Sequence, residues 1–148
     1  MSFLEELVKK GVIKQSQISE IKSRAKEKYQ GDIDEALMES GVNEETILET
    51  KGSYLQMPVH RVEPEEISFE VLKYISEDSA NHYGFVPIEM KDGALSVGVT
   101  DPENIQAMDA LQFISTKLGI PFKLFLISLG VYKKIMETYR GIGSQVEE

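Results

Sequence analysis

The chain has 148 residues, of which 41% are hydrophobic and 28% charged, and it contains neither cysteine nor tryptophan. This composition predicts a globular protein of one domain or two small ones, without disulfides, thiolate metal sites or a cysteine nucleophile. The net charge of −9 argues against nonspecific nucleic-acid binding, which needs a basic surface, and no run of 18 apolar residues is present to span a membrane.

The first 56 residues have the pattern of a helical region. Apolar residues recur at helical spacing from Phe3 to Val8, and Gly11 is typical of the residue that follows a helix. The pattern Leu-x-x-x-Gly-Val that ends at Val12 returns 30 residues later and ends at Val42. Each copy consists of a helix, a glycine, a hydrophobic residue and a second helix, so we predict two helical hairpins.

From Met57 the pattern changes to strands alternating with helices. The predicted strands are residues 58–62, 85–90, 94–100 and 121–127. Asp92-Gly93 is a strong signal for a two-residue hairpin turn. The last of these segments is apolar on both faces, which predicts a central strand of the sheet.

The helices predicted over 104–117 and 130–139 cover this sheet. Asp101 precedes Pro102, a pair that predicts Asp101 as the N-cap of the first of the two helices. The predicted core face of that helix consists of Ile105, Met108, Leu111, Ile114 and Leu118.

The predicted fold class is therefore α+β. A helical N-terminal subdomain of two helical hairpins, residues 1–56, precedes a small mixed α/β sheet subdomain with covering helices, residues 57–140. Residues 141–148 are polar and glycine-containing, and we predict that they begin a linker.

No signature of an enzyme is present. A P-loop needs a glycine-rich turn that ends in lysine, which the stretch 141–144 lacks. His60 falls in a predicted strand without carboxylates at metal-ligand spacing, and His82 falls at a helix end, where a cation suits the helix dipole. We therefore expect no catalytic residue, no metal and no cofactor. A small enzyme is the third functional class, and it would require a pocket with perturbed carboxylates.

The charge is segregated along the chain. Residues 1–30 carry 7 basic and 4 acidic side chains, a net +3, whereas residues 31–80 carry 3 basic and 13 acidic ones, a net −10. Such segregation is typical either of a solvated acidic face or of a surface for a basic partner. The candidate partner-binding residues are Asp32, Asp34, Glu35, Glu39, Glu44, Glu45 and Glu49.

Five short motifs in the second half fall in the order and spacing of a known module. They are His82-Tyr83-Gly84-Phe85-Val86-Pro87-Ile88, Asp92-Gly93-Ala94-Leu95-Ser96-Val97, Thr100-Asp101-Pro102, Leu111-Gln112-Phe113-Ile114 and Tyr139-Arg140-Gly141. With the repeated hairpins and Met57-Pro58-Val59, they resemble the N-terminal domain of the type II secretion and type IV pilus assembly ATPases. The resemblance covers about residues 3–141.

The resemblance implies a non-catalytic adaptor and regulatory domain. Such a domain would dock the ATPase to the cytoplasmic domain of an inner-membrane platform protein, with no direct membrane insertion. It would be cytoplasmic and peripheral to the inner membrane through its partners. In this family the catalytic core with its P-loop lies C-terminal, beyond a linker, and would be a further partner if the chain is a fragment.

The same resemblance leaves an alternative, a domain that senses cyclic di-GMP. In members that bind this ligand, each helical repeat opens with an Arg-Leu-Gly-like triplet. The corresponding triplets here are Ser2-Phe3-Leu4 and Asp32-Ile33-Asp34, which contain neither arginine nor glycine. Because the second triplet places two carboxylates where phosphates would lie, we expect cyclic di-GMP to be an unlikely partner, without micromolar binding.

Overall fold

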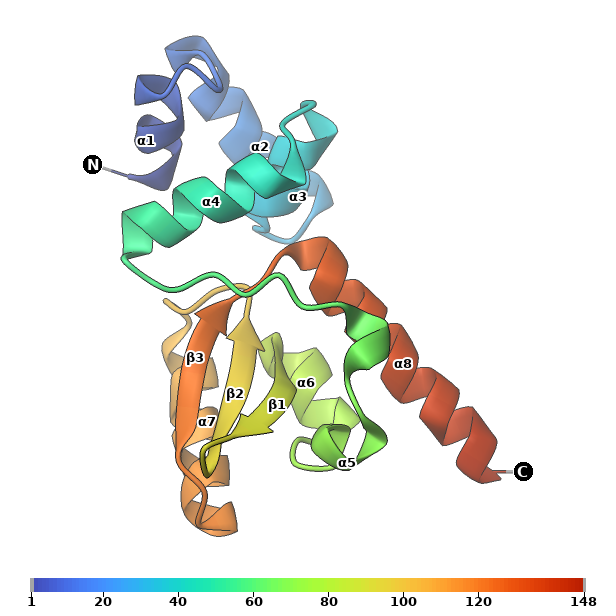
Figure 1. The fold of residues 1–148 in the computed structure, drawn as a ribbon. Helices are drawn as coiled ribbons and strands as arrows, with labels where there is room; N and C mark the ends of the chain where they lie inside the picture. The colour runs from blue at the N-terminus through green and yellow to red at the C-terminus, as the bar shows by residue number, and fades with distance from the viewer. Residues whose placement is uncertain (1, 148) are drawn as a thin grey trace. The chain divides into compact units, whose positions relative to one another are not determined.

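The structure is a computed structural model that describes residues 2–147, with side chains described for residues 2–141. It divides into two compact units, Met1–Met57 and Pro58–Glu148, which we call the helical unit and the α/β unit. Figure 1 shows the first unit as a group of helices and the second as a small sheet with helices packed against it.

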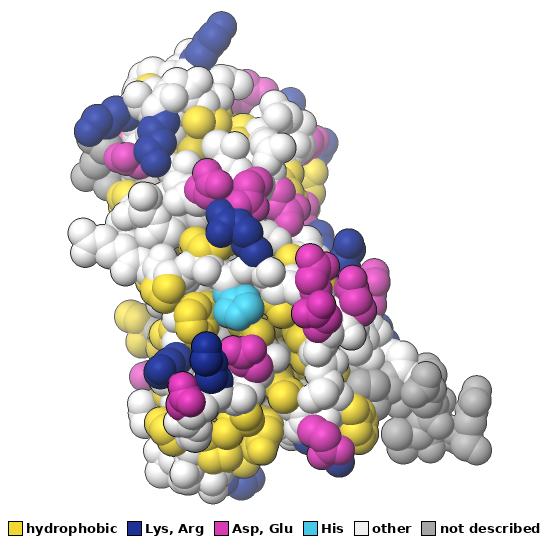
Figure 2. Space-filling model, viewed as in Figure 1, with side chains coloured by type: hydrophobic (Ala, Val, Ile, Leu, Met, Phe, Trp, Pro, Cys, Tyr) yellow, Lys and Arg dark blue, Asp and Glu magenta, His cyan; other side chains and the backbone are white. Residues whose placement is uncertain are grey.

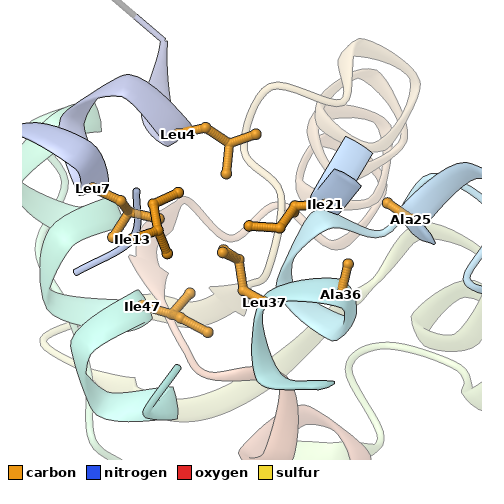
Figure 3. Close-up of a cluster of buried hydrophobic side chains, with 8 residues drawn as sticks. All are labelled: Leu4, Leu7, Ile13, Ile21, Ala25, Ala36, Leu37 and Ile47. Carbon is orange, nitrogen blue, oxygen red and sulfur yellow. The ribbon is translucent and has the colours of Figure 1, made fainter. Parts of the chain in front are cut away.

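The helical unit contains α1 (Phe3–Lys9), the 3-10 turn η1 (Gln15–Gln17), α2 (Ile18–Lys28), α3 (Ile33–Glu39) and α4 (Glu44–Leu55). All four helices contribute side chains to one cluster of buried aliphatic residues, and Ile13 joins it from the loop after α1 (Figure 3). The members of the cluster are Leu4, Leu7, Ile13, Ile21, Ala25, Ala36, Leu37 and Ile47. Burial of this cluster is what the helical spacing of apolar residues in the sequence predicts.

The helices α1 and α3 begin in the same way, 30 residues apart. The hydroxyl of Ser2 accepts a hydrogen bond from the Glu5 N–H at 3.2 Å. A carboxylate oxygen of Asp32 accepts one from the Glu35 N–H, also at 3.2 Å. Both residues are therefore N-caps, which satisfy a backbone donor that the first turn of a helix leaves without a partner.

The two helices also end in the same way. Gly11 and Gly41 follow them with φ of 77° and 94°, a left-handed conformation that glycine adopts without strain. In each copy the N–H of the next valine donates to the leucine carbonyl four residues before the glycine, at 2.9 and 3.0 Å. The repeat seen in the sequence is therefore a repeated structure, an N-capped helix closed by a Schellman turn.

The elements of the α/β unit are η2 (Pro64–Glu66), α5 (Phe69–Leu72), α6 (Glu77–Tyr83), β1 (Phe85–Lys91), β2 (Ala94–Val99), α7 (Ile105–Leu118), β3 (Phe122–Leu126) and α8 (Leu129–Glu147). The strand order is β1-β2-β3. β1 and β2 are antiparallel, whereas β2 and β3 are parallel and connected through α7. Asp92 and Gly93, with φ of 52° and 78°, form the predicted turn between β1 and β2.

The prediction that residues 121–127 form the central strand is wrong. The hairpin places β1 on one side of β2, and the α7 crossover returns β3 to the other side, so β2 is central. Segment 58–60 covers the outer edge of β3 at one point. There the Leu126 N–H donates to the Pro58 carbonyl at 2.8 Å, and the His60 N–H donates to the Leu126 carbonyl at 2.9 Å.

Segment 58–62 forms an isolated bridge between Val59 and Leu126 rather than the predicted strand. Pro58 has no N–H to donate to a ladder, and Pro64 begins η2 shortly afterwards. A proline at each end therefore limits the pairing of this segment.

The N-cap of α7 is Asn104 and not Asp101. The side-chain oxygen of Asn104 accepts from the Ala107 N–H at 3.1 Å. Asp101 instead accepts from the Glu103 N–H at 3.1 Å and so stabilises the turn before the helix. Both residues are good caps by type, and the sequence pattern favoured the one next to the proline.

The core face of α7 also differs from the prediction. Ala107 and Leu111 are each 1% exposed, whereas Ile105 is 75% and Leu118 is 40% exposed. The buried stripe of the helix is centred on these two core residues, one turn apart, and Ile105 in the first turn lies away from it. Apolar side chains thus occupy both the core face and the solvent face of α7.

Helix α8 is attached to the rest of the α/β unit by two tyrosines. The Tyr139 hydroxyl donates to the Ile75 carbonyl at 2.8 Å, and the Tyr132 hydroxyl donates to the Ala80 carbonyl at 2.8 Å. Burial of the Tyr139 ring raises the pKa of its phenol well above the ordinary value. Both bonds therefore use neutral phenols as donors to buried backbone acceptors.

The backbone of α8 stays helical to Glu147, through residues 141–147, where the sequence predicts the start of a linker. A helix needs backbone hydrogen bonds rather than apolar side chains, and a glycine weakens it by only about 1 kcal/mol relative to alanine. Among the residues described, no helix is both long and apolar enough to cross a bilayer.

Candidate functional site

The seven acidic residues singled out in the sequence lie on α3, on its N-cap and on the first half of α4. These two helices pack against each other. Figure 2 shows carboxylates gathered on this face of the helical unit, with basic side chains beside them. Acidic and basic groups thus lie side by side on this face, and some of the carboxylates form contacts within the unit.

One carboxylate of the group is paired inside the unit. The Lys51 ammonium on α4 forms a salt bridge with Asp34 on α3, and each side chain is only 15% exposed. The same ammonium lies 5.5 Å from the centre of the Phe3 ring on α1. The Phe3 ring is in turn 6.0 Å from the Tyr54 ring, centroid to centroid. We call Phe3, Asp34, Lys51 and Tyr54 the Lys51 cluster, since Lys51 joins three helices through it.

A second carboxylate connects α3 with α2. Glu39 accepts a hydrogen bond from the Tyr29 hydroxyl at 2.9 Å and from the Lys28 ammonium at 3.2 Å, and Arg24 lies 3.7 Å away. The hydrogen bond from Tyr29 is the main reason why the pKa of Glu39 is lowered. The same bond is the main reason why the pKa of Tyr29 is raised. Glu39 therefore attaches the end of α3 to the basic side of α2.

Several carboxylates of the acidic group have partners within the helical unit. Asp32 caps α3, and Asp34 and Glu39 bind basic or phenolic groups of the same unit. Glu35 and Glu44 are half-buried, while Glu45 and Glu49 are exposed on α4. On α4, exposure therefore distinguishes Glu45 and Glu49 from Glu44.

Sequence analysis missed Lys51. It is the only basic residue between Lys28 and Arg61, within the most acidic part of the chain. A single cation among many carboxylates is expected to form a salt bridge, so the isolated position of Lys51 in the sequence could have identified it.

The Lys51 cluster also brings together the two triplets at which the ligand motif of the family would lie. Phe3 belongs to the first triplet and Asp34 to the second, and Lys51 contacts both. Ser2 and Asp32, the first residues of the triplets, are the N-caps of α1 and α3. One residue of each triplet therefore contacts the Lys51 ammonium, which the prediction from the triplets left out.

The two histidines have structural surroundings. The His82 ring packs edge-on against Tyr83 at 4.6 Å, and the His60 ring packs edge-on against Phe125 at 5.3 Å, between centroids. The Nδ1 atom of His60 is buried without a hydrogen-bond partner among the residues described. Within the described part of the chain, no three His, Asp or Glu side chains lie close enough together to hold a metal ion.

Solved structures with the same fold cover nearly the whole chain. A structure of MshE with cyclic di-GMP aligns with a TM-score of 0.72 at 16% sequence identity, covering 95% of this chain and 98% of that one. The N-terminal domain of XpsE aligns with a TM-score of 0.62 at 20% identity, covering 91% of each chain. At these identities the likeness shows the fold. A search of curated protein sequences finds no match.

The class of protein follows from a family profile rather than from these fold matches, and it is the N-terminal domain of type II secretion and type IV pilus assembly ATPases. The family profile of the MshEN domain matches residues 55–140, more than half of the chain. The chain therefore belongs to the MshEN domain family. The resemblance and the α+β fold class predicted from the sequence are confirmed.

The comparison also corrects the expectation that cyclic di-GMP is an unlikely partner. MshE, with which this chain shares its fold, is solved with that ligand. The prediction required both Asp32 and Asp34 to repel phosphates. In the structure Asp34 is paired with the Lys51 ammonium, and Asp32 accepts a hydrogen bond from the first turn of α3.

Proposed function

We propose that this chain is a non-catalytic regulatory domain that docks a secretion or pilus ATPase to the cytoplasmic domain of an inner-membrane platform protein. The observation that carries the proposal is the family membership, because the matched structures are N-terminal domains and not catalytic cores. The isolated chain should accordingly show no ATP hydrolysis above background after repeated purification.

The exposed carboxylates Glu45 and Glu49 on α4 support a docking surface for a basic partner. Charges of this kind accelerate encounter with an oppositely charged surface, and salt screens them over about 8 Å at physiological ionic strength. The partner surface would therefore present lysine or arginine side chains toward the first half of α4.

The test is the association rate with the purified cytoplasmic domain of the platform protein, measured by stopped flow at several salt concentrations. Glu45→Lys and Glu49→Lys should each slow association about two- to fivefold at low salt and have little effect at high salt. Glu103→Lys, an exposed reversal in the α/β unit, is the matched control and should change little. An association rate independent of salt, or equal effects of all three variants, would contradict the proposal.

A second candidate function is binding of cyclic di-GMP, which the MshE structure favours. The Lys51 cluster offers suitable groups in the helical unit. The Lys51 ammonium suits a phosphate, the rings of Phe3 and Tyr54 suit a base, and the Asp34 carboxylate can accept from guanine N–H groups. Binding through this cluster requires the ligand to share Lys51 with Asp34.

Titration calorimetry of the full chain with cyclic di-GMP tests this candidate. Binding that is weakened at least tenfold by Lys51→Met and by Phe3→Leu, but not by Lys123→Met, would support it. Circular dichroism would show that the variants remain folded. Absence of binding to the wild-type chain at micromolar concentrations would contradict it and would leave the docking proposal intact.

A further inference from the structure

A pocket of about 490 Å³ opens on the α/β unit, between segment 74–83 and α7. Its lining combines aromatic rings, hydroxyl groups and one ammonium, among them Tyr74, Ser79, Tyr83, Phe113, Ile114 and Lys117. This volume and this mixture of apolar walls with a few polar groups are typical of binding pockets. All the residues that line the pocket belong to the α/β unit.

Two of the exposed apolar side chains of α7 line this pocket. Leu111 faces the core, whereas Phe113 lines the pocket and is 69% exposed, and Leu118 lines it and is 40% exposed. The Ile75 side chain at the pocket is 1% exposed and so belongs to the rigid core. A fixed apolar wall beside an exposed aromatic ring resembles the hot spots of protein interfaces, where aromatic residues are enriched.

The charges around the pocket are asymmetric. Lys117 is the only charged residue that lines it, and among the described residues no carboxylate pairs with its ammonium. On the opposite side, Glu77 and Asp78 flank the lining residues of α6 without lining the pocket themselves. Lys117 would therefore attract the negative group of a ligand and orient that group toward the C-terminal end of α7.

We propose that this pocket binds an amphipathic peptide segment of a partner protein, which inserts an aromatic side chain into the pocket and places a carboxylate at Lys117. The charge asymmetry favours this ligand, since one cation beside aromatic walls matches one carboxylate beside a ring. A peptide would also cover the Phe113 side chain, which is 69% exposed. Burial of this ring would contribute to affinity through the hydrophobic effect.

The experiment is an NMR titration of the full chain with two designed 12-residue helical peptides. One peptide carries phenylalanine, leucine and glutamate on the same face, and the other has lysine in place of the glutamate. We expect amide shifts at Ser79, Ala110 and Lys117, and at least fivefold tighter binding of the acidic peptide. Lys117→Glu should reverse this preference, and Lys123→Glu on β3, which does not line the pocket, should preserve it.

Phe113→Ala tests the aromatic wall without threatening the core, because the ring is mostly exposed. It should weaken the acidic peptide at least fivefold while the thermal unfolding midpoint stays near that of the wild type. Equal affinity for the two peptides, or shifts confined to residues away from the pocket, would overturn the proposal. Binding of 3-phenylpropionate as tightly as the acidic peptide would also overturn it, since the site would then be one for small aromatic acids.

Discussion

Polar side chains stabilise the two units in different ways. In the helical unit, charged groups join the helices: Lys51 binds Asp34, and Glu39 binds the Tyr29 hydroxyl and Lys28. In the α/β unit, a neutral phenol joins α8 to a backbone carbonyl that is 64 residues away in sequence. Charged contacts near solvent respond to salt and acid, whereas buried neutral hydrogen bonds do not. The two units should therefore respond to different solution conditions.

The units also differ in which side chains they leave exposed. The helical unit uses several acidic residues within its own fold. The α/β unit does the opposite, since Ile105 and Phe113 on α7 are exposed although they look like core residues. Charge alone therefore does not show which acidic side chains serve the fold, and hydropathy alone does not show which apolar side chains are buried.

The largest expected effect concerns the two faces of α7. Leu111→Ala should reduce the free energy of unfolding of the α/β unit by about 2–5 kcal/mol, because the side chain is 1% exposed and its loss leaves a cavity. Ile105→Ala on the same helix is the matched control and should change it by less than about 0.5 kcal/mol. Urea unfolding followed by circular dichroism measures both. Similar losses for the two variants would show that α7 packs in another rotation.

The next effect concerns the Lys51 cluster. Lys51→Met should destabilise the helical unit by about 1–3 kcal/mol, since it leaves the Asp34 carboxylate largely buried without its cation. Asp34→Asn combined with Lys51→Met should cost less than the sum of the single changes. A double-mutant cycle measured by urea unfolding gives this coupling. Additive effects would mean that the salt bridge contributes nothing to stability.

A smaller effect is expected at the neutral contact of α8. Tyr139→Phe should cost about 1–2 kcal/mol, because it leaves the Ile75 carbonyl without its donor. Burial raises the pKa of the Tyr139 phenol, so the folded state keeps a proton that the unfolded state loses above pH of about 10. The contribution of Tyr139 is therefore fully present below pH of about 10 and is lost as the pH rises further. Unfolding measured from pH 7 to 11 should show a shallower alkaline decline in the variant.

The smallest effect is acid sensitivity of the helical unit through Glu39. Its pKa is lowered in the folded state, first by the hydrogen bond from Tyr29, so its contribution is present above the unfolded pKa and is lost as the pH falls through the lowered value. Tyr29→Phe removes the main cause and should flatten this part of the pH profile. Thermal unfolding between pH 6 and 3 measures it. A profile unchanged by Tyr29→Phe would assign the acid sensitivity to other carboxylates.

Local features were predictable from the sequence because short-range rules set them. The hairpin at Asp92-Gly93 and the repeated turns at Gly11 and Gly41 depend on backbone conformations that few residue types adopt. The family was predictable because its motifs occur in order. These features specify the elements but not how each one packs.

The packing of the elements was less predictable. Hydropathy correctly placed Leu111 in the core face of α7 but also assigned Ile105 and Leu118 to it, although both are exposed. The partners of Lys51 and Glu39 come from other helices, so neighbours in the sequence do not identify them. The pocket beside α7 likewise depends on the approach of two segments that are about 30 residues apart, which periodicity does not describe.

The tyrosine contacts of α8 have a consequence for the order in which the chain folds during synthesis. The helical unit closes through neighbouring segments, and its two capped helices complete their turns within a few residues. Tyr139, by contrast, reaches backbone acceptors 64 and 67 residues earlier in the chain, and β3 must first pair with β2. Contacts between distant residues form slowly, and N-terminal regions leave the ribosome first. The helical unit should therefore fold during synthesis before α8 has left the ribosome, whereas the α/β unit can complete its fold only afterwards.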